Sequence, residues 1–217
     1  MTEPKIPRQV KSRMVKDNIL AAATQLIREH GYEFVTVSNV CQAAGVSTGS
    51  FYHHFANKDE LLAYYLIAGF EKHIQEFSSF PTDDVVNNVL RCYELYVDFM
   101  QEQGVDFVKN YYTTQNKSLD TYNAANSRTS IKVALPILDK TIELMQAAVQ
   151  SGELSAGVQA VELGEDLCMI EKGAIFDWCL SDGAYDLKQR SRRIMKDYLH
   201  RFLTPLYFER WPETYAD

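Results

Sequence analysis

The sequence TVSNVCQAAGVSTGSFYHHFANKDEL, residues 36–61, decides the fold. Thr36 can cap a first helix whose apolar residues recur at helical spacing, and Gly45 interrupts that helix. Ser47 can cap a second, short helix that turns Phe51 inward. Two helices joined by a short turn with glycine form a helix-turn-helix, and its second helix can enter the major groove of DNA. The stretch therefore predicts a DNA-binding motif.

The second helix of this motif presents polar groups to solvent. We expect the outward residues to be Thr48, Gly49, Tyr52 and His53. Because glycine has no side chain, the backbone at position 49 can approach DNA closely, while hydroxyl and imidazole groups can donate to phosphates or read base edges. His53 and His54 are successive residues that point in different directions on a helix, which argues against a metal site.

Helical periodicity continues on both sides of the motif, and no stretch alternates convincingly with the period of two that is typical of strands. Asn57 and Glu60 have the spacing of a capping box that opens a longer helix. We therefore predict an all-α fold. One further predicted helix ends at Gly31, and the others cover about 82–103, 105–115, 129–151, 158–181 and 186–205. Pro136 should lie in the first turn of its helix or kink it. Residues 116–128 are predicted to form a polar loop.

Charge is unevenly distributed along the chain. The net charge of −7 and the pI of about 5.3 at first argue against nucleic acid as a partner. Residues 1–60, however, have a net charge of +1, so that residues 61–217 have a net charge of −8. The sequence therefore predicts a short basic arm attached to an acidic body. The basic residues before position 17 oppose only Glu3, and they are Lys5, Arg8, Lys11, Arg13 and Lys16.

Other classes of protein find little support. No nucleophile elbow or other catalytic spacing occurs, so we expect no enzyme. Ser181, Asp182 and Asp186 resemble a cation loop, but a helix-to-helix turn with caps explains them better. No secretory signal or membrane span is present in the sequence, and we expect a cytoplasmic protein without a membrane partner. We expect no cofactor, and we expect buried, unpaired thiols at Cys41, Cys92, Cys168 and Cys179.

Residues 36–61 also resemble the DNA-binding motif of TetR-type transcriptional regulators. Four parts of the stretch fall in register with that motif: Ala-Gly-Val-Ser at 44–47, Gly49, Tyr-His-His-Phe at 52–55 and Lys-Asp-Glu-Leu at 58–61. The resemblance covers about residues 13–73. It implies an all-α homodimer, double-stranded operator DNA as a partner, a three-helix helix-turn-helix domain at 13–73 with its motif at 36–55, and a helical effector-binding and dimerisation domain at 74–217.

The resemblance also implies roles for individual residues. Thr36, Tyr52, His53 and Lys58 would hold the phosphate backbone, whereas Ser47, Thr48, Gly49 and Ser50 would lie near base edges. His54 would lie nearer the interior or at a phosphate, and Val37 and Ser38 complete the DNA-binding set. Unlike many relatives, this chain has no charged residue from Phe34 to Asn57. Recognition without a bidentate Arg would use hydroxyl, imidazole and apolar contacts or DNA shape.

Thirteen tyrosines point to a second site. A buried tyrosine needs a partner for its hydroxyl, so several of them in one helical body are compatible with a cavity that has apolar walls and a few polar groups, although such residues most often form core. We expect a small, apolar or aromatic effector, whose identity the sequence does not give. The residues predicted to bind it are Tyr65, Phe70, Tyr93, Tyr96, Met100, Tyr111, Tyr112 and Trp178.

Two apolar stripes near the C-terminus predict the dimer interface. Paired with their symmetry mates, they would form a four-helix bundle and present two recognition helices about one DNA turn apart. We therefore predict a repressor released from a palindromic operator by its effector; the alternatives are a ligand-independent or partner-controlled DNA-binding protein, an activator of the same fold, and a helical ligand carrier or enzyme. The stripes are Leu163, Leu167, Ile170 and Ala174, and Ile194, Tyr198, Phe202 and Leu206.

Overall fold

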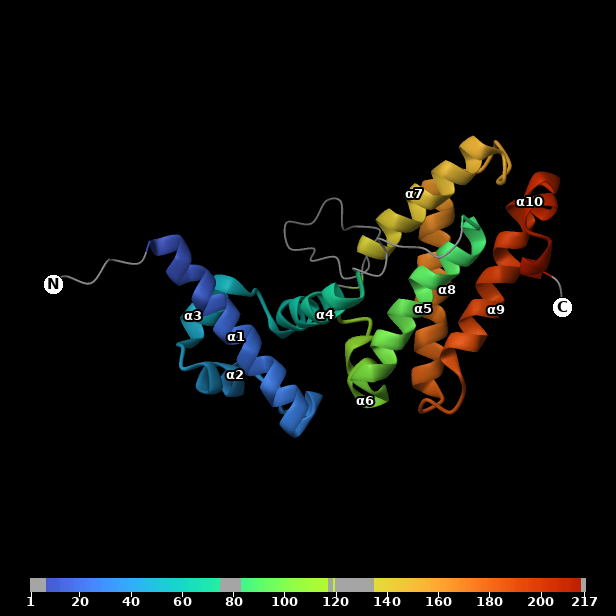
Figure 1. Ribbon diagram of the computed structural model, residues 1–217. Coiled ribbons are helices and arrows are strands. Elements are labelled where there is room, and N and C mark those ends of the chain that lie inside the picture. The colour runs from blue at the N-terminus through green and yellow to red at the C-terminus, as the bar shows by residue number, and fades with distance from the viewer. Residues whose placement is uncertain (1–6, 75–82, 117–118, 120–134, 216–217) are drawn as a thin grey trace. The chain divides into compact units, whose positions relative to one another are not determined.

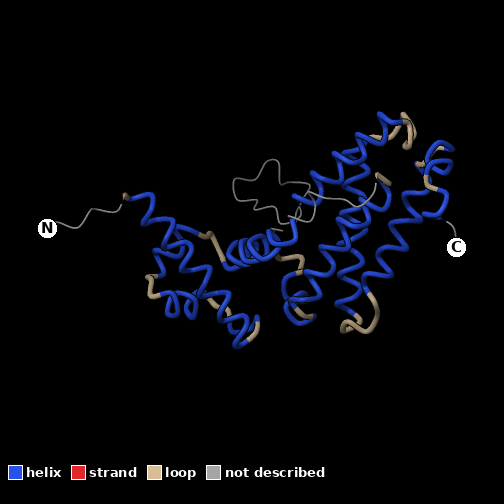
Figure 2. Tube along the Cα trace, viewed as in Figure 1, coloured by secondary structure: helices blue, strands red, loops and turns tan. Residues whose placement is uncertain are grey.

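The computed structural model describes residues 7–74, 83–116, 119 and 135–215. Within these ranges the chain is helical and contains no strand, apart from one isolated antiparallel bridge between Leu154 and Leu203 (Figure 2). The prediction of an all-α fold is therefore confirmed. The chain divides into two compact units: a first unit of residues 1–69 and 113–133, and a second unit of residues 70–112 and 134–217.

The first unit contains a helix-turn-helix. Helix α1 (Arg8–His30) packs on α2 (Val37–Ala44), and α3 (Thr48–His54) follows α2 after a short turn (Figure 1). A short 3-10 helix (Tyr32–Phe34) joins α1 to α2, and α4 (Lys58–Ile74) begins in this unit. The apolar sides of these helices form one core, which includes Ile19, Ala23, Val40, Phe51 and Leu62.

The second unit is built from longer helices that lie side by side. Helix α5 (Val85–Gln103) packs against α7 (Leu135–Ser151) and α9 (Leu187–Leu199), and α8 (Ala160–Leu180) packs against the same two helices (Figure 1). The short α6 (Val105–Tyr111) contacts α8, and α10 (Pro205–Arg210) follows α9. The core of this unit therefore lies where α5, α7, α8 and α9 face one another.

Caps and prolines move several helix ends from their predicted positions. The segment predicted at 82–103 begins only at Val85, because the Asp84 carboxylate accepts hydrogen bonds from the backbone N–H groups of the first turn. The segment predicted at 186–205 breaks after Leu199, and Pro205 opens α10 because proline fits the first turn of a helix and not its interior. The segment predicted at 105–115 ends already at Tyr111.

The predicted basic arm is for the most part a helix. Pro7 precedes the first turn of α1, which begins at Arg8, so the basic residues from position 8 onward are helical. Lys5 lies outside the described residues, as do the beginning of the segment predicted at 129–151 and nearly all of the loop predicted at 116–128. Pro136 lies in the first turn of α7, one of its two predicted positions.

The cysteines and the 181–186 turn have structural roles, as buried thiols and as a capped turn between two helices. All four thiols are buried and unpaired. Asp186 caps α9, because its carboxylate accepts the Gln189 N–H at 2.9 Å. Asp182 forms an ion pair with Lys109. The turn therefore serves to join α8 to α9.

Candidate nucleic-acid interface and effector site

The turn between α2 and α3 has the geometry that a helix-turn-helix requires. Gly45 ends α2 with φ of +65°, in the left-handed region that favours glycine, and its N–H donates back to the last turn of α2. The hydroxyl oxygen of Thr36 caps α2, and that of Ser47 caps α3 by accepting the Ser50 N–H at 3.1 Å. Both short helices thus begin at a defined hydroxyl, which fixes the direction in which α3 points.

Helix α3 separates an apolar side from a polar side. The rings of Phe51 and Phe55 are buried, with their centres 5.7 Å apart, and anchor the helix to the core. Tyr52 is 55% exposed although it follows Phe51 directly. The exposed residues of α3 and its cap are Ser47, Thr48, Gly49, Tyr52 and His53, while Ser50 and His54 are half-buried.

Gly49 has no role in the internal packing of the unit. A Cβ built at this position meets only the Ser47 Oγ, at 3.9 Å, within the usual contact range. The backbone there is ordinary right-handed helix, so conformation does not require glycine either. The missing side chain therefore matters only for what approaches α3 from outside.

The start of α2 is exposed as well. Thr36 and Ser38 are exposed, and Val37 is half-buried. The hydroxyl oxygens of Thr36 and Ser47 accept backbone hydrogen bonds, so each keeps its hydroxyl hydrogen for a phosphate or base acceptor.

Lys58, a predicted phosphate ligand, lies against an aromatic ring. Its ammonium group is 3.8 Å from the centre of the Tyr32 ring, and burial lowers the pKa of this half-buried lysine. Burial also raises the pKa of Tyr32 to about 12. Tyr32 holds Lys58 in place, and sequence reasoning missed it because the contact joins two segments that no motif relates.

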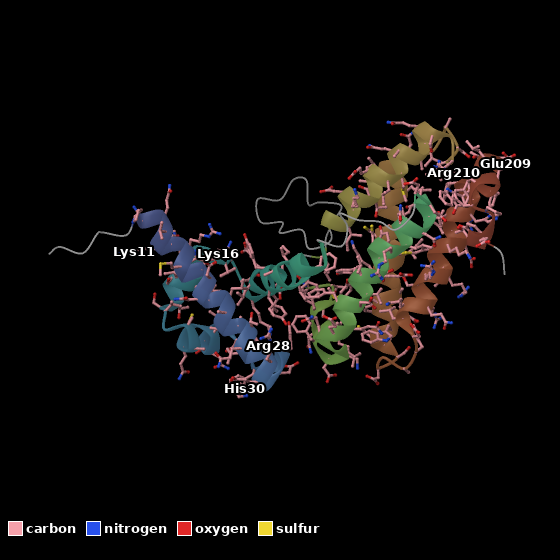
Figure 3. The ribbon with its side chains drawn as sticks, in the orientation of Figure 1. Lys11, Lys16, Arg28, His30, Glu209 and Arg210 are labelled. Carbon is pink, nitrogen blue, oxygen red and sulfur yellow. The ribbon has the colours of Figure 1, made fainter. Side chains whose placement is uncertain are left out.

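The basic residues of α1 divide into exposed and packed groups. Lys16 places its ammonium 3.5 Å from the Tyr64 ring centre and 5.6 Å from that of Phe55. Lys11 and Lys16 lie along the first half of α1, and Arg28 and His30 lie at its other end (Figure 3). The exposed basic residues in the first turns of α1 are Arg8, Lys11 and Arg13.

His54 is poorly suited to hold a phosphate through its charge. Burial lowers its pKa, and the neighbouring His53 and Lys16 lower it further, so the imidazole is neutral at neutral pH. Among the described residues no group of three His, Cys, Asp or Glu side chains could hold a metal ion.

The second unit collects most of the predicted effector residues in its core. The Tyr96 and Tyr112 hydroxyls are 2.7 Å apart, and the Tyr93 hydroxyl is 3.5 Å from the Cys168 thiol. Phe70, from the end of α4, packs its ring against Tyr96 at 5.7 Å. Met100 and Tyr111 are buried in the same unit. Six of the predicted effector residues are thus buried in the second unit, where ring and hydroxyl contacts join Phe70, Tyr96, Tyr111 and Tyr112.

Two predicted effector residues lie elsewhere. Trp178 is buried against Gly183, near the end of α8. Tyr65 belongs to the first unit, where burial raises its pKa and the nearby Arg28 partly offsets this effect. The sequence could not separate Tyr65 from Phe70, because both lie on α4 and the division into units falls between them.

A buried carboxyl in the second unit was not among the predicted residues. Glu171 on α8 is 2% exposed, and the Ser191 hydroxyl of α9 donates to its Oε2. The other carboxyl oxygen, Oε1, meets no donor among the described residues. Burial raises the pKa of the Glu171 carboxyl to about 7. The available signal was spacing, since Glu171 interrupts an apolar series at every fourth residue that includes Leu167 and Ile175.

Comparison with known proteins agrees with this arrangement. The model of the family "Bacterial regulatory proteins, tetR family" matches residues 19–65. The HTH-type transcriptional regulator UidR of Escherichia coli K12 is 22% identical over 176 residues, which are 78% of this chain and 84% of UidR. A putative TetR-family regulator from Rhodococcus sp. has a TM-score of 0.60 at 16% identity, over 88% of this chain and 100% of that one. The chain belongs to the TetR family.

This TetR-family chain is a DNA-binding transcriptional regulator. Thermus thermophilus FadR, a TetR-family repressor solved in complex with lauroyl-CoA, shares its fold with a TM-score of 0.57 at 17% identity, over 87% of this chain and 95% of that one. None of the described helices is long and apolar enough to cross a membrane.

Two residues of the apolar stripe predicted on α8 of the regulator are wrong as a dimer surface, whereas Ile170 and Ala174 of that stripe are half-buried. Leu163 and Leu167 are 3% and 0% exposed, because they fill the core between α8 and its own neighbours. The Tyr198 hydroxyl of the second predicted stripe donates to Asp166 of the same chain at 2.5 Å. A different side of α8 exposes apolar side chains, namely Val161, Met169, Phe176 and Leu180.

Proposed function

We propose that this regulator is a repressor that binds a palindromic operator as a homodimer and leaves it when a small, largely apolar molecule binds the second unit. The observation that carries the proposal is the polar, uncharged outer side of α3, which is backed by buried Phe51 and presents Tyr52 and Thr48 to solvent. A helix held in this way fits the major groove. The DNA-binding domain in this proposal is residues 13–73, and the effector-binding and dimerisation domain is residues 74–217.

Contacts to the operator are divided between two groups of residues in this proposal. Thr36, Tyr52 and His53 hold phosphates through hydrogen bonds, while residues 47–50 lie near base edges. Arg8, Lys11 and Arg13 are exposed and neutralise further phosphates, with Lys58 beside Tyr32. With about four such charge contacts in each subunit, affinity falls with salt with a slope on the order of −7.

Dimerisation in this proposal uses the exposed side of α8. Met169 is 70% exposed, and Phe176 and Val161 share its side of the helix. Exposed apolar residues that recur on one side of a helix are typical of a surface that a second copy covers. A two-fold axis at this surface would match the symmetry of a palindromic operator.

Release by an effector would use the continuity of α4. This helix begins in the first unit at Lys58 and ends in the second, where Phe70 packs on Tyr96. A molecule that binds near Phe70 in only one of two conformations of the protein would favour that conformation, and so shift α4 and with it the DNA-binding domain. A shift of the population from 1:99 to 99:1 needs roughly 5.5 kcal/mol of differential affinity. The lauroyl-CoA bound by the Thermus thermophilus FadR supports an effector with a large apolar part.

Selection of bound sequences from random duplex DNA tests the proposal. The expected result is a palindromic consensus that the wild-type protein and an Arg193→Gln control bind, and that Tyr52→Ala binds much more weakly. Absence of any consensus, or equal binding by Tyr52→Ala, would overturn it. Arg193 is a suitable control because it is exposed and lies on α9 of the second unit.

A ligand-independent regulator is the second candidate, and one contact favours it. The Tyr96 and Tyr112 hydroxyls bond to each other and need no ligand to satisfy them. A thermal-shift screen of small molecules separates the two candidates, because an effector raises the melting temperature whereas a core closed by its own side chains gives no shift.

A further inference from the structure

We infer that Glu171 is the recognition point for a positively charged nitrogen on the effector, so that the regulator responds to an amphipathic organic cation. The inference rests on the proposed function, because it assigns the chemistry of the molecule that would bind the second unit. The inference does not depend on the helix-turn-helix motif of the first unit.

The first step is the position of the carboxyl among polar groups from several helices. Glu171 acts electrostatically on Tyr93 and Tyr96 of α5, on Tyr112 after α6, and on Cys168 one turn earlier on α8. From α9, Ser191 donates to Oε2. Three of the predicted effector tyrosines therefore lie near enough to interact electrostatically with a buried carboxyl whose second oxygen, Oε1, meets no donor among the described residues.

The second step is the absence of a positive partner. Within the described residues only burial and the Ser191 hydroxyl shift the ionisation of Glu171. Basic residues close to Ser191 along α9 pair elsewhere: Arg190 with Asp177 at 3.7 Å, Arg192 with Glu94, and Lys188 with Asp98 at 2.6 Å. A buried carboxyl is ordinarily paired with a cation or fully hydrogen-bonded, and Glu171 is neither.

The third step is the contrast with the other buried acids of this unit. Asp84 accepts hydrogen bonds from Tyr207 at 2.7 Å and from the first turn of α5. Glu153 accepts from the guanidinium of Arg210 at 2.9 Å and from the indole of Trp211. The fold thus satisfies its structural carboxyls, which sets Glu171 apart as a group kept for a ligand.

The chemistry of the site selects the class of ligand. An ammonium group can donate a charge-assisted hydrogen bond to Oε1, and the phenol rings of this core can add cation–π attraction. Burial raises the pKa of Glu171 to about 7, so a bound cation would favour the carboxylate at neutral pH. A carboxylate or phosphate head group at the same place would be repelled. The site therefore discriminates by charge as well as by apolar contact.

A head-group series tests the inference on the full-length wild-type protein. We would measure binding of 4-phenylbutylamine, 4-phenylbutanol and 4-phenylbutanoate by calorimetry, because the three probes share one apolar body. The expected result is that the amine binds at least about tenfold more tightly than the alcohol, and the carboxylate more weakly than either. Equal affinities, a preference for the carboxylate, or no binding of the amine would overturn the inference.

Two variants assign the preference to this carboxyl. Glu171→Gln keeps the shape of the side chain, and we expect it to bind amine and alcohol equally. Glu143→Gln removes one exposed negative charge from α7 of the same unit, and we expect it to keep the wild-type preference. An amine preference that survives in Glu171→Gln would overturn the inference. Melting curves establish that both variants are folded, and the wild-type series decides the inference even if Glu171→Gln does not fold.

Operator binding, measured on the same preparations, keeps this inference separate from the proposed function. A protein that binds its palindrome and is released by neutral or anionic probes, but ignores the amine, would contradict the inference and leave the proposed function intact. A protein that binds the amine selectively but no DNA sequence would contradict the proposed function alone.

Discussion

The two units of this regulator place their polar chemistry on opposite sides of their helices. In the first unit the side chains that point inward from α3, such as Phe51, are apolar, and those that point outward are polar. In the second unit a carboxyl and several phenol groups lie inside, with Glu171 and Tyr96 buried among apolar residues. The difference matches the two kinds of ligand: a DNA surface is met from outside, and a small molecule is enclosed.

Substitutions at Phe51 and Tyr52, two adjacent residues of α3, should differ most in their effect on stability and so test this comparison most directly. Phe51→Ala should destabilise the first unit by about 3–5 kcal/mol, because it removes a fully buried ring. Tyr52→Phe should change the free energy of unfolding by about 0.5 kcal/mol or less, since its ring remains and the residue is exposed. Urea denaturation followed by circular dichroism measures both.

Tyr52→Phe, which should hardly change stability, should weaken DNA binding. Loss of the Tyr52 hydroxyl removes a hydrogen bond to phosphate, so operator affinity should fall by about tenfold while the fold persists. An operator titration with the folded Tyr52→Phe variant checks this. If its affinity equals that of the wild type, the polar outer side of α3 is not the DNA surface at this residue.

The buried acid of the second unit gives the next effect, through pH. Glu171 has a pKa of about 7 in the folded protein against a usual value of 4.5, so the folded state holds the proton more tightly than the unfolded state. The contribution of Glu171 to the free energy of unfolding is therefore greatest at low pH and falls by roughly 3 kcal/mol as the pH rises from about 4.5 to above 7. Urea denaturation of the wild type and of Glu171→Gln at a series of pH values should show this fall as a change in the difference between the two proteins.

Glu171→Gln is the control for that pH dependence. The difference in unfolding free energy between variant and wild type isolates Glu171, because His54, whose pKa is lowered, contributes equally to both proteins. Tyr93 and Cys168, which lie close by, have raised pKa values and titrate above this range. A constant difference from pH 4.5 to 8 would show that Glu171 is not buried as a lone carboxyl.

Gly49→Ala sharpens the distinction between internal and external roles. Its Cβ meets nothing closer than 3.9 Å, and alanine favours helix over glycine, so the first unit should become more stable by up to about 1 kcal/mol. Operator affinity should nevertheless fall by about tenfold, since the new methyl group lies where the backbone approaches DNA. Thermal melting and an operator titration measure the two effects. An unchanged affinity would place DNA away from Gly49.

How much the sequence predicts differs between the units for a physical reason. In the first unit, caps, turn glycine and helical spacing are local signals, so Thr36, Gly45 and Ser47 fall where the sequence places them. In the second unit the groups that interact with Glu171 come from α5, from Tyr112 after α6, and from α9, and no local pattern relates them. Leu163 and Leu167 of the α8 stripe were misplaced for a similar reason, because periodicity identifies an apolar side but not whether its own chain covers it.

The smallest expected effect concerns the charges of α1. Lys11 is exposed near the start of the helix, and Lys16 is held over the Tyr64 ring. If Lys11 contacts a phosphate, Lys11→Gln should reduce the slope of log affinity against log salt by about 1 per subunit while leaving sequence preference unchanged. Lys140→Gln, on α7, removes the same charge from the second unit and should leave the slope unchanged. Operator titrations at several salt concentrations check both variants. Equal slopes for Lys11→Gln and the wild type would confine charge neutralisation to other residues, and a slope altered by Lys140→Gln would mean that the acidic body also meets DNA.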